Sequence, residues 1–230
     1  APDDPAGSTL SREELLAKIS ETQELGGTQV LLQGGLHPDL DLAFYEDMLR
    51  AMKATGIHVH GFSPPEIHHF AEISGLSVRA VLERLITAGL DSIPGGGAEI
   101  LSNRVRRELA PRKCDADQWI AVMKEAHGLG LRTTATMMFG HVETAAERVE
   151  HLQRVRDLQD RTGGFTAFIP WPFQPDHTPL AAARHIDKTT AVTYLRTLAL
   201  SRIFLDNVTN VQVSWVTQGP KIAQVSLFFG

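Results

Sequence analysis

Leu131-Arg132-Thr133-Thr134-Ala135-Thr136-Met137-Met138-Phe139-Gly140-His141-Val142-Glu143-Thr144 is the stretch that decides the fold of this 230-residue chain. The run up to Phe139 is apolar with interspersed threonines, which predicts a strand buried on both faces. Gly140 ends the run, so His141 and Glu143 fall in a loop after the strand. Barrels of alternating strands and helices keep catalytic side chains in such loops. An ordinary connecting loop is the alternative for this stretch taken alone.

Strands and helices alternate on both sides of this stretch. Thr144, with Glu147 three residues later, predicts a capping box that opens a helix reaching Arg161. Further strands are predicted at 28–32, 57–62, 90–93, 165–169 and 211–215, and alternation places His58, His60 and Phe62 on one face of their strand. Further helices are predicted at 11–25, 41–56, in two stretches within 66–89, at 99–109, from 115 onwards and at 187–205. Ser11 with Glu14 predicts a second capping box, and Asp115 with Gln118 opens the helix from 115. Leu25 and Val149 are assigned to apolar helix faces. About six parallel strands with crossover helices predict an α/β fold, and the many glycine-marked strand ends favour a partial TIM-like (βα) barrel over a Rossmann crevice.

Composition predicts one soluble domain over residues 1–230. The chain is 43% hydrophobic, enough for one substantial core. A net charge of -5 and a pI near 6.1 give no indication of a nucleic-acid or membrane surface. No run approaches the length of a membrane span, and the first residues of the given sequence lack the basic-then-apolar pattern of a signal peptide. The single cysteine, Cys114, excludes an internal disulfide and is typical of the cytoplasm.

Polar and glycine-rich segments follow five of the predicted strands. In a parallel barrel these strand ends are expected to meet over one mouth, where glycines let the backbone approach a ligand closely. The five segments are Gln33-Gly34-Gly35-Leu36-His37, Ser63-Pro64-Pro65-Glu66, Pro94-Gly95-Gly96-Gly97-Ala98-Glu99, Gly140-His141-Val142-Glu143 and Trp171-Pro172-Phe173-Gln174.

Three chemistries could use this mouth. The first is a divalent-metal hydrolase built on His58 and His60, completed by His37, His68, His69 or His141. Its weakness is that the pair begins its strand instead of ending it, and no aspartate ends a strand. The second, Schiff-base chemistry, needs a lysine at a strand end, and all the lysines fall elsewhere. The third is binding of an adenosyl cofactor by backbone atoms of the glycine segments.

A family resemblance favours the third chemistry. The runs that carry it are Gln33-Gly34-Gly35-Leu36-His37-Pro38, Phe62-Ser63-Pro64-Pro65-Glu66-Ile67, Gly95-Gly96-Gly97-Ala98-Glu99-Ile100-Leu101, 133–144 and 163–171. Together they resemble the radical S-adenosylmethionine (radical SAM) enzymes of the futalosine menaquinone pathway. The run 168–175 is most similar to the cyclases that act on dehypoxanthine futalosine. Aminofutalosine synthase and FO synthase are similar siblings and stay as alternatives.

The resemblance implies a reaction. A [4Fe-4S] cluster would reduce S-adenosyl-L-methionine to a 5'-deoxyadenosyl radical, with flavodoxin or ferredoxin as electron donor. The radical would abstract a hydrogen from the substrate ribose, and the carbon radical would close a spiro ring on the aromatic ring. Loss of an electron and a proton would complete the step, with His60 or His141 as proton acceptor.

The resemblance also implies roles for individual residues. Gly34 and Gly35 match the family's glycine motif, and Glu99 matches a cofactor-contacting carboxylate by its strand position. The expected catalytic residues are His60, His141 and Glu143. The expected cofactor-binding residues are Gly34, Gly35, Ser63, Gly96, Gly97 and Glu99. The expected substrate-binding residues are His37, Glu66, Met137, Trp171 and Gln174.

One departure from the family is severe. The Cys-x3-Cys-x2-Cys loop that holds the cluster is absent, and Cys114 alone cannot replace three thiolates. We therefore expect no metal site in this chain, and a truncated barrel without its first strand, cluster loop and C-terminal end, residues 1–10 being a loop remnant. A cluster-less protein that binds an adenosyl compound or nucleoside is the alternative.

Overall fold

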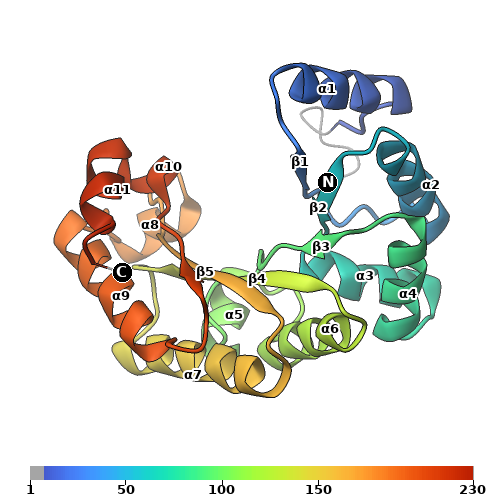
Figure 1. Ribbon diagram of the computed structural model, residues 1–230. Helices are drawn as coiled ribbons and strands as arrows, with labels where there is room; N and C mark the ends of the chain where they lie inside the picture. The colour runs from blue at the N-terminus through green and yellow to red at the C-terminus, as the bar shows by residue number, and fades with distance from the viewer. Residues whose placement is uncertain (1–7, 230) are drawn as a thin grey trace.

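The structure, a computed structural model, describes residues 8–229 and contains one curved parallel sheet (Figure 1). The order of the strands in the sheet is their order in the chain, β1 to β6. The strands are β1 (Gln29–Leu32), β2 (His58–Gly61), β3 (Ser92–Ile93), β4 (Arg132–Phe139), β5 (Phe165–Pro172) and β6 (Asn210–Val211). This arrangement confirms the predicted α/β fold with crossover helices.

The helices form a layer outside the sheet (Figure 1). They are α1 (Arg12–Glu24), α2 (Leu42–Lys53), α3 (Pro64–Ser74), α4 (Val78–Ala88), α5 (Asn103–Leu109), α6 (Ala116–Gly128), α7 (Ala145–Thr162), α8 (Pro179–Arg184), α9 (Ala191–Phe204), α10 (Trp215–Gln218) and α11 (Pro220–Ser226). Of the expected loop remnant, residues 8–10 have neither helix nor strand, and the rest lies outside the described residues. Within residues 8–229, no helix combines the length and apolarity that a membrane crossing requires.

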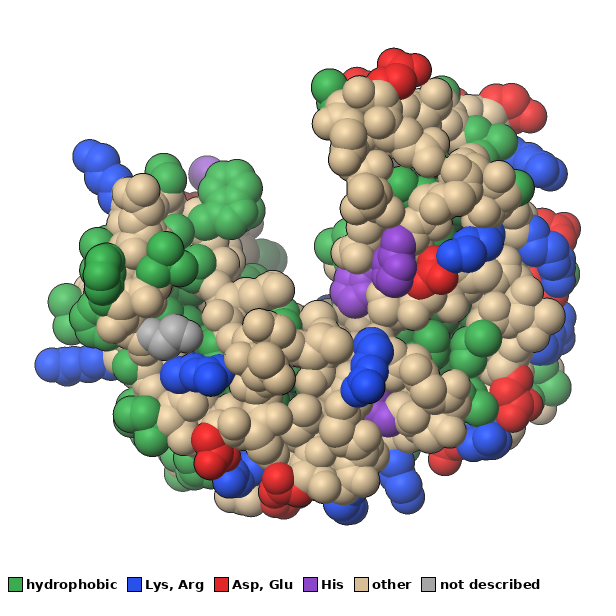
Figure 2. All heavy atoms as spheres, viewed as in Figure 1, with side chains coloured by type: hydrophobic (Ala, Val, Ile, Leu, Met, Phe, Trp, Pro, Cys, Tyr) green, Lys and Arg blue, Asp and Glu red, His purple; other side chains and the backbone are tan. Residues whose placement is uncertain are grey.

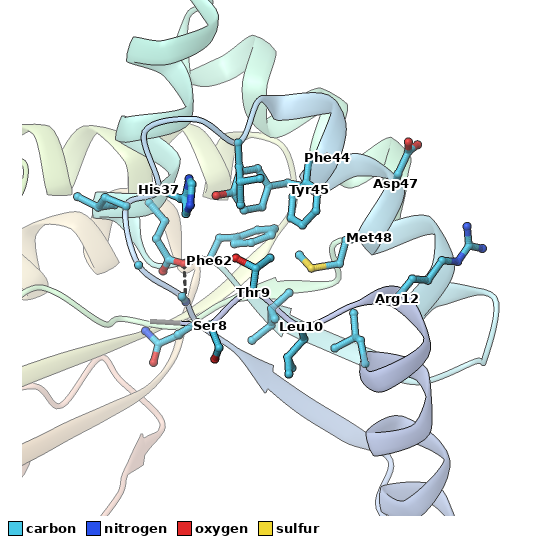
Figure 3. A pocket seen from close by; sticks show the side chains of 18 of the residues that line it. Ser8, Thr9, Leu10, Arg12, His37, Phe44, Tyr45, Asp47, Met48 and Phe62 are labelled. Atoms are coloured by element: carbon cyan, nitrogen blue, oxygen red, sulfur yellow. Dashed lines mark hydrogen bonds between the residues drawn. The ribbon is translucent and has the colours of Figure 1, made fainter. Parts of the chain in front are cut away.

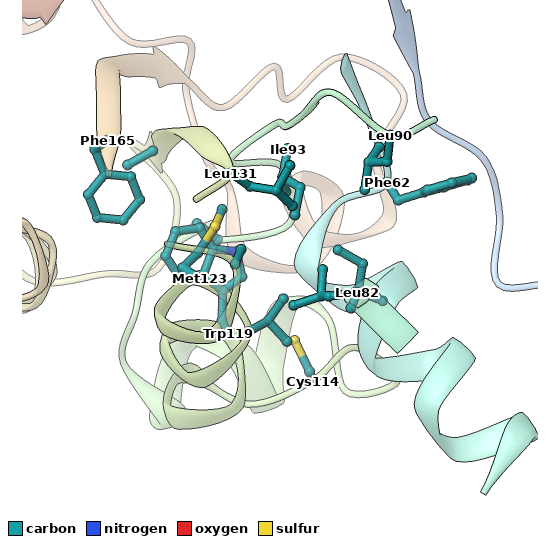
Figure 4. Packing of buried hydrophobic residues seen from close by; sticks show 14 of the residues in the cluster. Phe62, Leu82, Leu90, Ile93, Cys114, Trp119, Met123, Leu131 and Phe165 are labelled. Carbon is teal, nitrogen blue, oxygen red and sulfur yellow. The ribbon is translucent and has the colours of Figure 1, made fainter. Parts of the chain in front are cut away.

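Side chains of β4 show which face of the sheet is covered. Ala135 and Met137 are fully buried against the helices, whereas Thr134 and Thr136 are half-buried on the other face. Figure 4 shows part of the core that forms on the covered side, around Trp119 and Met123 of α6. The expectation that β4 is buried on both faces is therefore wrong, because helices pack on one side only.

The uncovered face lines a wide hollow. Figure 2 shows this hollow between the N-terminal part of the molecule and its C-terminal helices. The sheet does not close, since β1 and β6 each pair on one side only among the described residues. The fold is therefore a partial barrel whose inner wall is open to solvent.

Helix starts follow the predicted capping chemistry. Ser11 with Glu14, Asp115 with Gln118, and Thr144 with Glu147 each form a reciprocal capping box. In each box the side chain at the cap accepts from the backbone three residues on, which satisfies an otherwise unpaired N–H group.

Two corrections concern strand ends. Phe62 was expected on the same face as His58 and His60, but it packs at ring-centroid distances of 5.6 Å from Tyr45 and 5.1 Å from Phe70 in the helical layer. The cause is its positive φ of 58°, which turns the chain out of the β2 alternation. The strand predicted at 211–215 ends at Val211, and Trp215 begins α10.

Other corrections concern helices. The helix expected from Glu99 begins at Asn103, because the left-handed φ of 47° at Glu99 is incompatible with a helix start. Leu25 and Val149, assigned to apolar faces, are 83% and 52% exposed. The short helices α8 and α11 were not predicted; both carry a proline at their first turn.

Candidate functional site

Glu66 connects the first two strand ends. The Gly34 N–H donates to Glu66 Oε1 at 2.9 Å, and the Ser63 N–H and hydroxyl donate to Oε2 at 2.8 and 2.5 Å. The carboxyl is 3% exposed, so burial raises its pKa although these hydrogen bonds oppose the rise. Glu66 therefore fixes the glycine segment and occupies the Gly34 N–H.

The larger cavity, of about 760 Å³, lies beside this segment (Figure 3). Its walls are mostly apolar, and its polar lining includes Glu66, His37, the backbone of the glycine segment and the charged residues Arg12 and Asp47. Other lining residues include Leu10, Tyr45, Met48 and Phe62. A Cβ added at Gly35 would meet no atom within 4 Å, so Gly35 faces open space. The backbone here can be approached by a ligand, which fits the expected role of Gly34 and Gly35.

The glycines after β3 have a different explanation. A Cβ at Gly95 would lie 2.6 Å from the Ala135 Cα and the Thr134 carbonyl oxygen. Gly97 has a φ of +70°, and its Cβ would lie 2.5 Å from Pro65. The Cβ of Gly96 would lie 2.3 Å from the Gln33 amide nitrogen. Packing and backbone conformation therefore account for Gly95 and Gly97, whereas the Gln33 side chain beside Gly96 is flexible. The cofactor-binding roles of Gly96 and Gly97 stay predictions.

Glu99 lines the smaller cavity, of about 450 Å³. Its carboxylate accepts from Lys113 Nζ at 2.8 Å. Met138 and Phe173 contribute apolar walls. Met137, expected to contact substrate, is fully buried on the helix side of β4, so the structure places its neighbour Met138 at the cavity instead.

Three polar side chains meet on the inner wall of the barrel. Ser92 Oγ lies 2.8 Å from His58 Nε2 and 2.7 Å from His60 Nδ1. Asp91 Oδ2 lies 4.0 Å from His58 Nδ1, and Asp91 also binds Lys53. Burial and the neighbouring His58 lower the pKa of His60, so the His60 ring is neutral near pH 7.

His141 and Glu143 form a buried cluster at the end of β4. Both side chains are 0% exposed. His141 Nε2 lies 2.9 Å from the Met138 carbonyl oxygen, and Nδ1 accepts from the Val142 N–H at 2.7 Å. Glu143 accepts from the N–H groups of Gly140 and His141 and from the Arg148 guanidinium. Burial raises the Glu143 pKa, but the His141 ring, 2.9 Å from Glu143 Oε2, and the backbone N–H groups of Gly140 and His141 lower it to about 2.

Trp171 and Gln174 lie at the end of β5. Trp171 pairs in register with Met138 of β4 and is half-buried on the inner side. The Gln174 amide donates to the Pro172 carbonyl oxygen in its own loop at 3.0 Å. Their expected contact with substrate stays a prediction.

The strand ends do not share one cavity. Gly34, Gly35, His37 and Glu66 line the larger cavity and Glu99 the smaller, whereas His141 lines neither. The chain segments behind the two cavities are in contact, since Gly96, three residues before Glu99, packs against Gln33. The expected site residues are therefore divided between two cavities, and the His141 side chain is sealed apart from both.

Sequence reasoning missed Lys113, Ser92 and Met138. Lys113 was set aside because it lies in a loop, but the loop after α5 brings it to Glu99. Ser92 could have been found, since parallel pairing sets it beside His60. Met138 required knowing which face of β4 the helices cover.

An iron–sulfur cluster does not fit the residues that the structure describes. Cys114 is 8% exposed, and burial raises its pKa to about 11, which disfavours the thiolate that iron needs. Within residues 8–229, no group of three or more His, Cys, Asp and Glu side chains could hold a metal ion. The histidine-ligated hydrolase therefore has no site in this part of the chain.

Known proteins show similarity over the whole chain. Cyclic dehypoxanthine futalosine synthase is 47% identical in Halalkalibacterium halodurans (100% of this chain, 62% of the relative) and 44% in Streptomyces coelicolor (99% and 57%). Aminodeoxyfutalosine synthase of Thermus thermophilus is 45% identical (95% and 59%). The chain thus spans about 60% of the length of these curated relatives.

A solved structure shares this fold, and two family models match the chain. The crystal structure of HydG, a maturase of the [FeFe]-hydrogenase, superposes with a TM-score of 0.73 at 13% identity, covering 99% of this chain and 50% of that one. The CofH/MqnC C-terminal region matches residues 162–230. The radical SAM superfamily matches residues 2–155, about two thirds of the chain. The protein therefore belongs to the radical SAM superfamily.

Proposed function

We propose that the complete gene product is a radical SAM cyclase that converts dehypoxanthine futalosine to its cyclic form. The observation that carries this proposal is the 47% identity to a cyclic dehypoxanthine futalosine synthase across the whole chain. S-adenosylmethionine and a [4Fe-4S] cluster are the cofactors of the family, and the cluster ligands would come from outside these 230 residues. An electron donor such as flavodoxin or ferredoxin would be the partner.

The glycine segment after β1 would hold S-adenosylmethionine. When bound, this cofactor supplies the radical chemistry of the family. The open space at Gly35 supports this role. Because Glu66 occupies the Gly34 N–H, the segment would offer its backbone carbonyl oxygens to accept from an ammonium group. Glu66 would then act by positioning the segment.

His60 would accept the proton released at the end of the reaction. We assign the Ser92 hydroxyl hydrogen to His58 Nε2, the tautomer in which the His58 Nδ1 proton faces Asp91 Oδ2, 4.0 Å away. The Ser92 oxygen then accepts from His60 Nδ1–H, so His60 Nε2 carries the free lone pair. His141 has both ring nitrogens occupied, and a carboxylate with a pKa of about 2, as in Glu143, is a weak base.

Aminodeoxyfutalosine synthase is the second candidate, because its Thermus relative is 45% identical. Trp171 and Gln174, within the run 168–175, favour the cyclase.

Anaerobic assay of the complete gene product with dehypoxanthine futalosine tests the proposal. We expect the cyclic product, and His60→Gln should lower turnover about 10²- to 10⁴-fold, the usual contribution of a general base. The matched control is His68→Gln on α3, whose ring pairs with Glu72 on the same helix at 3.6 Å. Wild-type turnover in the His60→Gln variant would show that His60 is not the proton acceptor. Absence of the cyclic product, together with formation of aminodeoxyfutalosine when the substrate of aminodeoxyfutalosine synthase is supplied instead, would assign the chain to that sibling enzyme.

A further inference from the structure

Residues 176–188, which include α8, form a strap whose two ends are anchored at the end of β4. Before the strap, the Phe173 N–H donates to the Phe139 carbonyl oxygen at 2.8 Å. After it, Thr189 packs on Gly140, where an added Cβ would collide with the Thr189 hydroxyl. Because the two anchors hold neighbouring residues of β4 and its loop, the strap is a surface loop of the Ω type, with its ends close together.

The strap is weakly attached between its anchors. No residue of the strap is fully buried, and no other helix or strand in the described part of the chain packs extensively on α8. Within residues 8–229, its one polar bond to the rest of the protein joins Arg184 Nη2 to Glu108 Oε1 of α5 at 2.5 Å. The Arg184 side chain is 59% exposed, and ion pairs that contact solvent contribute little to stability. The strap can therefore separate from α5 at small cost.

Two residues beside α8 can absorb a movement of the strap. His177 and His185 have φ angles of 60° and 52°, in the left-handed region that residues other than glycine rarely adopt. Hinges of closing loops are a few residues at the ends of elements that take up the change in backbone angles. Because α8 lies between these two residues, it can swing as one piece.

The strap also forms one wall of the smaller cavity. Thr178, Pro179 and Leu180 line the cavity from the strap, and Leu109 and Met138 line it from the body of the protein. A ligand that fills the cavity therefore touches the strap, and these contacts favour the closed position over an open one. The apolar walls suit the aromatic body of a nucleoside. The proposed function places S-adenosylmethionine at the glycine segment of the larger cavity, which leaves the smaller one to the substrate.

We propose that residues 176–188 are a lid, latched by Arg184 and Glu108, that opens to admit the nucleoside substrate to the smaller cavity and closes over it. Closure keeps solvent out of the cavity during the reaction, and opening releases the product. The inference rests on the proposed function for the identity of the substrate.

Hydrogen–deuterium exchange, read by mass spectrometry on the complete gene product, tests the lid. Without ligand, the amides of 176–188 should exchange at least about tenfold faster than those of α7, because the strap opens locally. Dehypoxanthine futalosine at about 100 times its dissociation constant should slow this exchange by up to about 100-fold, the effect of a ligand that binds only the closed state.

A latch variant and a matched control sharpen the test. Arg184→Gln should speed exchange of the unliganded strap by up to about fivefold, the range that an exposed ion pair supplies. Arg79→Gln breaks a similarly exposed ion pair, with Glu125 of α6 at 3.3 Å, and should leave exchange of the strap unchanged.

Two results would overturn the lid. One is unliganded exchange in 176–188 as slow as in α7, and the other is exchange that bound dehypoxanthine futalosine does not slow. Calorimetric titration shows whether the substrate is bound. Absence of both binding and turnover of dehypoxanthine futalosine would instead count against the proposed function, and the comparison of unliganded wild type with Arg184→Gln would still decide whether the strap opens.

Discussion

Two histidines near the ends of strands show opposite environments. His141, after β4, is sealed, and both of its ring nitrogens are bound to backbone groups or Glu143. His60, in β2, is half-buried on the inner wall and uses Nδ1 for Ser92. The same residue type therefore serves the loop structure in one place and remains available for proton transfer in the other. Position along a barrel strand does not by itself identify a catalytic histidine.

Glu143→Ala is expected to have the largest effect on stability. It would leave two backbone N–H groups and the Arg148 guanidinium without their buried partner, which should cost about 3 to 5 kcal/mol. Urea denaturation measures the difference, with Glu150→Ala on the surface of α7 as the control. A cost below that of the control variant would mean that the cluster around His141 is not structural.

Acid should weaken the His141 cluster in a defined pH window. The Glu143 pKa is about 2 in the folded protein against an ordinary value of 4.5, so its contribution is complete above about pH 4.5 and is lost as pH falls towards 2. The contribution corresponds to about 3 kcal/mol. Glu143→Gln lacks this titration, so the stability gap between wild type and variant should narrow between pH 5 and 3. A gap that does not change with pH would contradict the low pKa.

Ser92→Ala should change the free energy of unfolding less than Glu143→Ala or the protonation of Glu143. Ser92 links two half-buried rings, and its loss should cost about 1 kcal/mol. Ser20→Ala, on the exposed face of α1, is the control. Ring ¹⁵N shifts of His60 should change with the tautomer, while those of His141 stay as in the wild type. Unchanged His60 shifts would show that Ser92 does not select the tautomer.

The local features of the fold followed from the sequence. β4 and the capping boxes at Ser11 and Thr144 depend on residues within a few positions of one another, so a sequence pattern contains the necessary information. The alternation of strands and helices then predicted the parallel sheet. The exposure of side chains was harder to predict, because Leu25 and Val149 lie on faces to which no neighbouring helix packs.

Sequence analysis named residues of the candidate site but not the contacts that they make. Glu66 was expected to contact substrate, yet its Oε2 closes a local capping box with Ser63 and its Oε1 holds the Gly34 N–H. The Gly34 contact arises only when β1 and β2 lie side by side. The positive φ at Glu99 and the approach of Lys113 likewise depend on the tertiary fold. Side chains that are far apart in the sequence but close in the fold leave no pattern of spacing that sequence analysis can detect.

The contrast between Gly35 and Gly95 has an evolutionary consequence. Folding alone would preserve Gly95, because any side chain there would collide with the β4 backbone. Folding places no such demand on Gly35, whose added methyl group would meet nothing. In a lineage released from selection for ligand binding, Gly35 should drift to other residues while Gly95 persists.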